Sequence, residues 1–350
     1  MKTLITGATG FVGRHLIRAL GEEARVGAGA GGFEVFGTSY PQPPWPSDRD
    51  IIFLDLRAEG DLFKLVRDVR PDWVFHLAAV SNVRSSWQMR RETLETNIIG
   101  TQNLLESVRL AAPGARVLFI SSSDVYGIVA SKEKPLAEDD PVQVTNPYAY
   151  SKAAGEMMCG FYVNVEGLDI VTARQFPHTG PGQTADFVCS DWARQIVRIE
   201  RGESEPVIRV GNLEVKRDFS DVRDVVKAYI MLMRKGRKGE VYNVCSEKAL
   251  ALREILEFLK SEAETGPFRH PGPPGIKAGR QTTIKIQVDP GKLRKTDVPL
   301  LLGSHRKLVA ETGWSPRIPI EQTLRDLLAC WREKSDEIIS GPCNIARKTP

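Results

Sequence analysis

Cysteine and histidine are scarce in this chain of 350 residues, with five of each, and neither type forms a cluster. The number of cysteines is odd and no Cys-x-x-Cys pair is present, so the pattern argues against a disulfide framework and against a zinc site. We therefore expect reduced, mostly structural thiols and no metal.

Long hydrophobic runs and long basic runs are also missing. No apolar stretch approaches the ~20 residues of a membrane-spanning helix. The formal net charge of +4 is spread along the chain, which gives no indication of nucleic-acid binding. Strand-like residues begin directly after Met1 and leave no room for a signal peptide, so we expect a cytoplasmic protein that does not enter a membrane.

Short apolar runs alternate with helical patterns through the first half of the chain. The expected strands are residues 2–6, 34–38, 50–54, 72–77 and 116–120, and the expected helices are 14–20, 61–69, 89–111 and 147–161, with a loop at 22–32. This alternation predicts an α/β fold of the Rossmann type, a doubly wound parallel sheet with ligands at the carboxyl ends of its strands. The second half adds helices at 222–234, 252–260 and 320–332 and a strand at 240–244.

A glycine-rich turn follows the first strand. Its sequence is Gly7-Ala8-Thr9-Gly10-Phe11-Val12-Gly13. Glycines between a strand and a helix let the backbone approach a pyrophosphate, which binds at the helix N-terminus. The gap between the first two glycines is one residue longer than in the usual dinucleotide-binding fingerprint. The alternative interpretation of these glycines is an ordinary tight turn. The position favours a dinucleotide site that includes Gly7, Gly10, Phe11, Val12 and Gly13.

The end of the second strand indicates which dinucleotide binds. NAD-selective enzymes place an acid there to hold the ribose 2′-hydroxyl. Here the residues are Ser39 and Tyr40, and Arg14, just inside the glycine turn, can meet a 2′-phosphate. An arginine in a first turn can also be simply solvated. Both features favour NADP(H) over NAD(H), with Ser39 and Arg14 as contacts.

Small or polar residues end the next three strands. Asp55 and Leu56 follow the third strand and are expected to contact adenine, and Leu77, Ala78 and Ala79 close the fourth and leave room for a cofactor. The fifth strand opens into the run Ser121-Ser122-Ser123-Asp124. All of these segments share one sheet edge with the glycine turn, so a single crevice can hold the cofactor and hydroxyl donors.

Tyr148 and Lys152 lie four residues apart, on one face of the helix expected from Pro147 onward. A nearby ammonium favours the phenolate, so we expect the pKa of Tyr148 to lie below the usual value of about 10. Such a tyrosine can move a proton to or from an alcohol or carbonyl oxygen, and Ser122 can hydrogen-bond that oxygen. A chance pair on a solvated face is the alternative.

These motifs together resemble the extended short-chain dehydrogenase/reductases that act on nucleotide sugars. The segments GATGFVG, HLAA, SSSDVYG and NPYAYSK stand in the family's order and spacing, and the resemblance covers residues 1–332. It implies that Ser122, Tyr148 and Lys152 are catalytic, and that Lys152 also holds the nicotinamide ribose. It further implies a homodimer formed through the helices at 89–111 and 148–166.

The second half resembles GDP-4-dehydro-6-deoxy-mannose reductases within that family. The resemblance is carried by RQFPHTGPGQ at 174–183, GNLE at 211–214, RDFSDVRD at 217–224 and TGWSP at 312–316. It implies that Arg217 meets the diphosphate and that the segment 294–297 holds the nucleotide. The substrate-binding residues expected on this basis are Ser123, Asp124, His178, Asn212, Arg217, Arg294 and Asp297.

Two positions depart from the family pattern, because Pro177 replaces an asparagine that contacts the substrate and Lys295 replaces a proline. The resemblance implies NADPH-dependent reduction of GDP-4-dehydro-6-deoxy-D-mannose to GDP-D-rhamnose. A GDP-mannose 4,6-dehydratase or a nucleotide-sugar 4-epimerase is the alternative enzyme, since Asp124 stands where dehydratases place an acid. The glycine turn lacks their Gln-Asp-Gly form. Pro177 also keeps open a catalytically silent NADP-binding protein.

The expected domains follow from these assignments. Residues 1–172 form the NADP-binding domain, which regains parts of 205–246, and residues 173–332 form the smaller α/β domain that binds the nucleotide sugar. The segment 266–279 is rich in proline and glycine and is expected to be a lid or linker loop. Residues 333–350 form a polar tail.

Overall fold

The computed structural model describes residues 1–26, 32–41, 51–131, 134–265, 284–293 and 296–333. Seven of the described strands form one parallel sheet in the order β11-β6-β5-β4-β1-β2-β3. They are β1 (Lys2–Thr6), β2 (Glu34–Ser39), β3 (Ile51–Phe53), β4 (Trp73–His76), β5 (Arg116–Ser122), β6 (Asp169–Gln175) and β11 (Val241–Val244). This order is doubly wound, with the reversal between β1 and β4, so the predicted fold class is confirmed.

Both faces of the sheet are buried, which explains the continuous apolar runs of its strands. Successive residues point to opposite faces. Thus Ile5 and Phe75 pack with one group of helices, whereas Leu4 and Val74 pack with the other. Because the side-chain period is two, each strand contributes to both cores, and its ends are left for the polar residues of the site.

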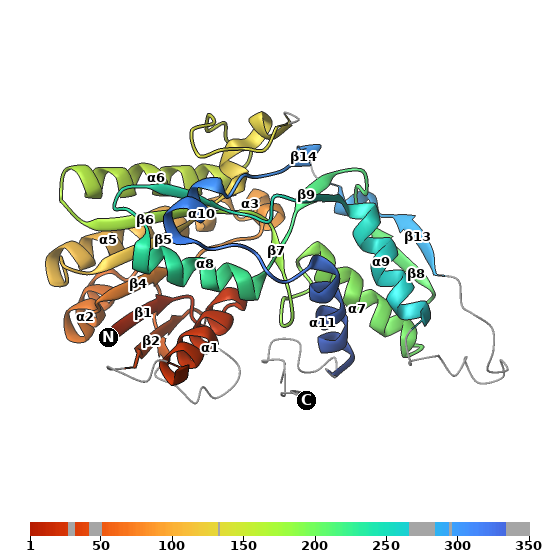
Figure 1. The fold of residues 1–350 in the computed structure, drawn as a ribbon, viewed down its shortest axis with the longest axis horizontal. Coiled ribbons are helices and arrows are strands. Elements are labelled where there is room, and N and C mark those ends of the chain that lie inside the picture. Colours follow the sequence, from red (N-terminus) through yellow and green to blue (C-terminus); the bar gives the residue numbers. More distant parts are fainter. Residues whose placement is uncertain (27–31, 42–50, 132–133, 266–283, 294–295, 334–350) are drawn as a thin grey trace.

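Helices cover the two faces of the sheet (Figure 1). One face carries α1 (Phe11–Val26), α8 (Val222–Lys235) and α10 (Arg306–Thr312). The other carries α2 (Glu59–Val69), α5 (Gly100–Ala111) and α6 (Pro147–Asn164). The short segments α3 (Val83–Gln88), α4 (Arg90–Leu94) and the π-helical turn η1 (Glu95–Ile99) lead into α5, and the 3₁₀ segment η2 (Ser123–Ser131) follows β5.

A smaller unit lies beside the sheet, to the right in Figure 1. Its core joins α7 (Val188–Glu200), α9 (Leu252–Thr265) and α11 (Ile320–Glu333) to β8 (Val207–Val210) and β13 (Lys285–Val288). Three further strands, β9 (Lys216–Asp218), β12 (Ala249–Ala251) and β14 (Leu300–Leu301), form a small sheet. The remaining short elements are β7 (His178–Thr179), β10 (Ser220–Asp221) and η3 (Pro290–Lys292).

Most expected elements are present, with three differences. Helix α1 continues to Val26, so the predicted loop is wrong for residues 22–26, and residues 27–31 lie outside the described part. The helix expected at 89–111 is divided into α4, η1 and α5. Strand β6 spans residues 172 and 173, where the predicted boundary falls, and β11 lies in the same sheet. The division into domains remains a prediction.

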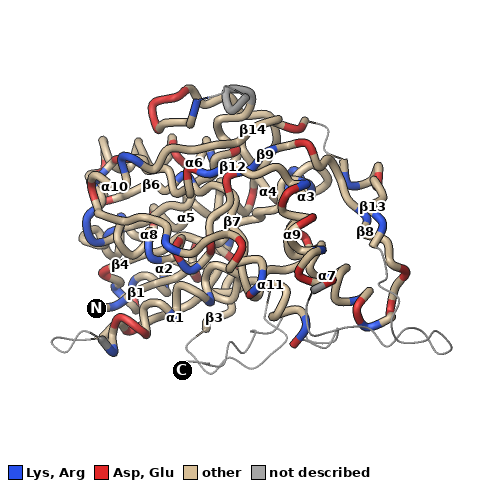
Figure 2. Tube along the Cα trace, turned by 45° about the vertical axis from the view of Figure 1, so that its right-hand side comes forward, with Lys and Arg blue, Asp and Glu red and all other residues tan. Residues whose placement is uncertain are grey.

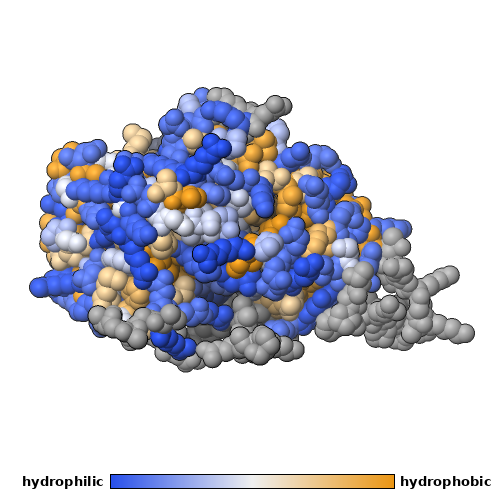
Figure 3. Space-filling model, viewed as in Figure 1, coloured by the Kyte–Doolittle hydropathy of each residue, from blue (hydrophilic) through white to orange (hydrophobic). Residues whose placement is uncertain are grey.

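Cysteines are mostly buried thiols in the described residues. Cys159, Cys189 and Cys245 are free, but Cys330 on α11 is disulfide-bonded, so the prediction of reduced thiols is wrong at that position. The described helices include none that is long and apolar enough to span a membrane. Acidic and basic residues are interspersed over the described trace (Figure 2), and the face seen in Figure 3 is mostly hydrophilic, with hydrophobic residues between the hydrophilic ones.

Candidate active site

The glycine turn lies against the end of β4. Gly7 has φ +70°, and a Cβ on it would come within 2.9 Å of the Ala78 backbone. A Cβ on Gly13 would come within 2.5 Å of the Ala8 carbonyl oxygen. Side chains at these positions would therefore collide with the backbone, and their absence leaves the first turn of α1 open to a phosphate group. These residues fit a dinucleotide.

The other predicted cofactor residues surround this turn. Val12 and Leu77 pack against the core below it, and the Leu77 N–H donates to the Thr6 carbonyl oxygen over 3.3 Å. Leu56 is buried where Gly100 of α5 leaves space for it. Ala78 and Ala79 are half-buried at the same edge. Val12, Leu56 and Leu77 thus serve the packing of the sheet, and contact of any of these residues with a cofactor stays a prediction.

Ser39 joins the end of β2 to the glycine turn. Its hydroxyl lies 2.6 Å from the Thr9 hydroxyl and donates to the Pro41 carbonyl oxygen over 3.1 Å. No acid stands at this position, so the region where a ribose 2′-substituent would lie is bordered by hydroxyl groups.

Arg57 is a cation at this edge that the sequence analysis missed. It forms a two-pronged ion pair with Asp55, with 2.6 Å between Nη2 and Oδ2, and its guanidinium lies 5.8 Å from the centre of the Tyr40 ring. The hydrogen bonds from Arg57 hold the pKa of Asp55 below its usual value. The signal in the sequence was an arginine two residues after the aspartate that ends the third strand.

Arg14 connects the glycine turn to the segment after β7. Its guanidinium donates to the Thr9 carbonyl over 3.1 Å and to the Gly182 carbonyl over 3.0 Å, and the neighbouring His15 contacts the Pro181 carbonyl at 2.9 Å. Burial lowers the pKa of Arg14. The simply solvated alternative is therefore wrong, while contact with a 2′-phosphate stays a prediction.

Ser122, Asp124 and Tyr148 come together above the end of β5. The Ser122 hydroxyl donates to Asp124 Oδ2 over 3.4 Å and accepts from the Asp124 N–H over 3.1 Å. It also hydrogen-bonds the Tyr148 hydroxyl, which lowers the pKa of Tyr148, but burial and then the charge of Asp124 have larger, opposite effects. The net result is a raised pKa, so the expectation of a lowered value is wrong for the ligand-free protein.

Lys152 lies one turn further along α6 and is also buried. Its ammonium donates to the Ile120 carbonyl over 2.7 Å and sits 5.2 Å from the centre of the Phe119 ring. Burial lowers the pKa of Lys152 to about 8, and the neighbouring Glu156 carboxylate acts in the opposite direction. The ammonium is thus directed at the strand rather than the phenol, which explains why it does not lower the pKa of Tyr148.

Asn97 fixes the backbone on the other side of this helix. Its side-chain oxygen accepts from the Val80 N–H over 2.8 Å, and its amide donates to the Val80 carbonyl over 3.1 Å and to the Ser151 hydroxyl over 2.9 Å. Ser151 in turn donates to the Tyr148 carbonyl over 2.7 Å. Asn97 is buried, so its side chain fixes neighbouring backbone and does not face solvent.

Three of the predicted substrate-binding residues form one cluster. Arg217 Nη2 donates to Asp297 Oδ1 over 2.8 Å, and Asn212 donates to Asp297 Oδ2 over 3.3 Å. Arg217 also donates to the Val298 carbonyl over 2.7 Å. Arg294 lies outside the described residues. His178 lies elsewhere, because its ring stacks on Phe11 of the glycine turn at 5.9 Å and 3°.

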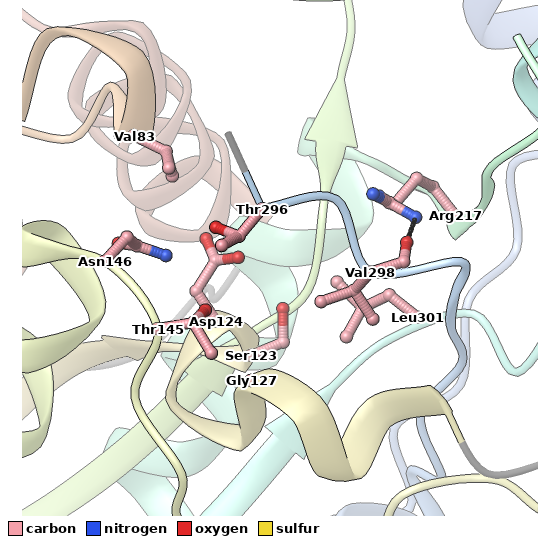
Figure 4. Close-up of a pocket in the computed structure, with 10 residues that line it drawn as sticks. All are labelled: Val83, Ser123, Asp124, Gly127, Thr145, Asn146, Arg217, Thr296, Val298 and Leu301. Carbon is pink, nitrogen blue, oxygen red and sulfur yellow. Dashed lines mark hydrogen bonds between the residues drawn. The ribbon is translucent and has the colours of Figure 1, made fainter. Parts of the chain in front are cut away.

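A pocket with about 380 Å³ of empty space extends from Arg217 of this cluster to Ser123 and Asp124, which directly follow Ser122. Asp124, Ser123 and Thr296 point into it, with Asn146 and Arg217 at opposite ends (Figure 4). Its lining residues are Val83, Ser123, Asp124, Gly127, Thr145, Asn146, Arg217, Thr296, Val298 and Leu301. Asn146 and Thr296 lie within two predicted segments, NPYAYSK at 146–152 and the segment 294–297, but neither was predicted individually to line the site. Thr145, directly before the first of these segments, was not predicted.

This arrangement suits proton transfer beside a bound dinucleotide. A glycine turn between a strand and a helix, a buried serine, tyrosine and lysine, and a polar pocket share the carboxyl edge of a doubly wound sheet. These features define an extended short-chain dehydrogenase/reductase. The profile of the family described as GDP-mannose 4,6 dehydratase matches residues 4–327, and the chain belongs to that family.

Comparison with individual proteins agrees with this assignment. GDP-6-deoxy-D-mannose reductase from Pseudomonas aeruginosa is 35% identical over 336 residues, which are 96% of this chain and 99% of the relative. GDP-mannose 4,6-dehydratase from Vibrio cholerae is 28% identical, with 93% and 92% covered. The structure of RMD from Pseudomonas aeruginosa complexed with NADPH has a TM-score of 0.78 and 34% identity, with 95% and 98% covered.

More distant relatives share the architecture as well. UDP-glucose 4-epimerase from Thermotoga maritima, solved with UDP-glucose, has a TM-score of 0.79 at 25% identity and covers 95% of this chain and 99% of its own. The same fold therefore serves proteins named as reductases, dehydratases and epimerases, and local groups must decide between these reactions.

Proposed function

We propose that this protein reduces the 4-keto group of GDP-4-dehydro-6-deoxy-D-mannose to give GDP-D-rhamnose, with NADPH as the reductant. The observation that carries the proposal is that the buried Ser122, Tyr148 and Lys152 meet at the end of β5, directly before Ser123 and Asp124, which line a pocket that also holds Arg217. Full-length similarity to a GDP-6-deoxy-D-mannose reductase supports the same substrate class.

In the proposed reaction the bound cofactor supplies a hydride to C4 of the sugar. Tyr148 donates its phenolic proton to O4, and Ser122 hydrogen-bonds the oxyanion as it forms. The raised pKa of Tyr148 keeps the phenol protonated at neutral pH, which is the form that a proton donor requires. Lys152 would hold the nicotinamide ribose, with its ammonium kept in place by the Ile120 carbonyl.

The pocket residues support binding of a nucleotide diphosphate. Arg217 offers a planar fork that suits phosphate oxygens, and Asp297 and Asn212 hold it in place. We propose that Ser123 and Asp124 contact the sugar and that Arg217 contacts the diphosphate. Pro177 offers no side-chain donor, and its carbonyl accepts from the Ser220 N–H over 3.0 Å, so sugar binding must use these other groups.

NADP(H) is the proposed cofactor, with NAD(H) as the alternative. Two cations border the end of β2, Arg14 on the glycine turn and Arg57 over the Tyr40 ring. Arg14 is bonded to two carbonyls, whereas Arg57 pairs with Asp55 and is more exposed. This difference favours Arg57 as the principal contact.

The enzymatic proposal is tested with purified protein and GDP-4-keto-6-deoxymannose. NADPH absorbance should fall with formation of GDP-D-rhamnose, and unchanged absorbance would contradict the proposal. Tyr148→Phe should reduce turnover by about a thousandfold or more while NADPH still binds, because the ring remains and only the proton donor is lost. Equal activity of this variant would remove the catalytic role of Tyr148.

A dehydratase is the second candidate, and Asp124 is the observation that favours it. Its carboxylate lies 3.4 Å from the Ser122 hydroxyl and faces the same pocket, where an acid could assist elimination of water. A 4,6-dehydratase would turn over GDP-mannose with no net use of NADPH. Product analysis with GDP-mannose alone therefore separates the two enzymes.

We also propose that the protein is a cytoplasmic homodimer. Support for the dimer comes from α6, where Tyr150, Met157 and Phe161 are exposed, and from Leu110 on the neighbouring α5. Met157 and Phe161 are one turn apart on one helix face. Burial of this apolar face against a second copy would remove it from water.

A further inference from the structure

Three side chains of helix α6, each one turn apart, hydrogen-bond three consecutive residues of β5. Tyr148 hydrogen-bonds Ser122, Lys152 donates to the Ile120 carbonyl over 2.7 Å, and Glu156 accepts from the Ser121 hydroxyl over 2.5 Å. Two of these side chains already have proposed roles in the reaction. Glu156 completes the series on the same helix face.

Glu156 is held from the opposite side by Arg174 of β6. Their ion pair measures 2.8 Å between Nη2 and Oε2, with a further bond of 3.0 Å from Nε to Oε1. Arg174 is itself fixed by the Tyr126 hydroxyl and the Glu138 carbonyl, each at 3.0 Å. Glu156 and Arg174 are 12% and 7% exposed, so the carboxylate is rigidly placed beside the strand.

A buried ion pair on its own would be only structural. Here, however, the carboxylate bonds the residue directly before Ser122 and stands one turn beyond Lys152. Any shift of Glu156 would therefore move the strand segment that carries the catalytic hydroxyl and the carbonyl that orients the ammonium.

We propose that Glu156 is a positioning residue of the active site, which holds Ser121 so that Ser122 meets Tyr148, and which keeps Lys152 in its ammonium form. The proposal rests on the proposed function for its kinetic readout only.

Several other ionisable groups lie around Lys152, and each must be compared with Glu156 as a source of negative charge. On α6 they are Tyr148 and Cys159, on β4 His76, on η2 Asp124 beside Tyr148, and on β6 Arg174 beyond Glu156. Burial raises the pKa of Cys159 and lowers the pKa of His76 to about 3, so both are neutral at pH 7. Asp124 acts on the phenol end of the site, and Glu156 is therefore the carboxylate that opposes the burial of Lys152.

The first experiment measures the pKa of Lys152 directly, by NMR titration of the ligand-free protein with ¹³C-labelled lysine. The signal is assigned by its loss in Lys152→Arg. Glu156→Gln should lower the pKa of Lys152 by about half a unit or more, because the variant removes a negative charge one turn away. An unchanged value would overturn the electrostatic part of the proposal, whatever the enzyme's substrate.

The second experiment measures turnover with the GDP-4-keto sugar. Glu156→Gln should reduce kcat by about tenfold, with KM for NADPH changed by less than about twofold, because the reacting groups are displaced and the cofactor site is not. Ser121→Ala should reduce kcat by about threefold and leave the pKa of Lys152 unchanged, since it removes only the strand contact. Wild-type kcat in both variants would overturn the positioning role.

Matched variants separate positioning from general stability. Asp169→Asn breaks a similar ion pair between β5 and β6, with Arg116 at 2.8 Å, at the opposite end of these strands. It should lower stability and leave both kcat and the pKa of Lys152 unchanged. If Glu156→Gln fails to fold because Arg174 is left unpaired, the double variant Glu156→Gln with Arg174→Gln restores neutrality and gives the same two measurements. An effect of Glu156→Gln on stability alone, as in Asp169→Asn, would also overturn the proposal.

Discussion

Lys152 combines burial with a charge that the proposed reaction needs. Its side chain is 4% exposed, and its pKa of about 8 lies well below that of lysine in an unfolded chain, about 10.4. The folded protein therefore holds this proton less tightly than the unfolded chain does. Below pH 8 the burial of the ammonium opposes folding, and this opposition disappears as the pH rises towards the unfolded pKa.

This difference predicts how stability depends on pH. The free energy of unfolding of the wild type, relative to Lys152→Met, should increase by up to about 3 kcal/mol between pH 7.5 and 10. Urea unfolding of both proteins across this range checks the prediction. Other groups titrate equally in the two proteins and cancel, so a pH-independent difference would contradict the lowered pKa.

Arg57 carries the second prediction at the scale of single residues. Arg57→Ala should raise KM for NADPH by about tenfold or more, because a charge-assisted hydrogen bond to the 2′-phosphate is lost, and should leave KM for NADH nearly unchanged. Arg67→Ala is the matched control, since Arg67 forms an ion pair with Asp68 on the surface of α2. Equal weakening of both cofactors would show that Arg57 acts through Asp55 instead.

Among the elements, the π-helical turn η1 shows how one buried side chain can set a helix path. The turn contains Asn97, which reaches back to both backbone groups of Val80 and across to Ser151 of α6. It thereby connects the end of β4, where a cofactor would lie, to the helix that carries Tyr148. Local widening of a helix at a functional position is a common feature of π-turns.

Loss of this connection should lower the free energy of unfolding. Asn97→Ala leaves the Val80 N–H and carbonyl without partners, so the free energy of unfolding should fall by about 2 to 3 kcal/mol. Chemical denaturation followed by fluorescence measures the change. Glu92→Ala, on the exposed side of the preceding α4, should change stability by less than about 0.5 kcal/mol. A similarly small effect at Asn97 would mean that water replaces its bonds.

At the scale of the whole molecule, helices α5 and α6 present an exposed apolar face. Met157 and Phe161 are 78% and 52% exposed, although both belong to a helix whose other face is buried in the core. A second copy of the chain would bury these side chains and stiffen the helix that carries Tyr148 and Lys152.

The proposed dimer predicts a change of mass on substitution. Phe161→Glu should convert the protein to a monomer at micromolar concentration, because a charge buried in an apolar interface lacks a partner. Light scattering or sedimentation measures the mass. Val288→Glu is the control, since Val288 on β13 is similarly exposed but lies in the smaller unit. A wild-type protein that is already monomeric would contradict the proposal.

Much of this architecture follows from short-range patterns in the sequence. Buried parallel strands appear as apolar runs, and a helix places residues i and i+4 on one face. These rules locate the strands, the glycine turn and the pair of Tyr148 and Lys152. They hold because neighbouring residues in the chain decide the local backbone geometry, whichever partners fold against it.

Tertiary structure decided what depends on burial and on distant partners. The direction of the pKa shift of Tyr148 is set by its desolvation and by Asp124, and Arg14 is bonded to a carbonyl 168 positions away. Arg217 meets Asp297 across 80 positions, and Glu156 meets Arg174 from a different element. Sequence spacing contains no information on such contacts, because water exclusion and electrostatic balance arise only once the chain has folded around these groups.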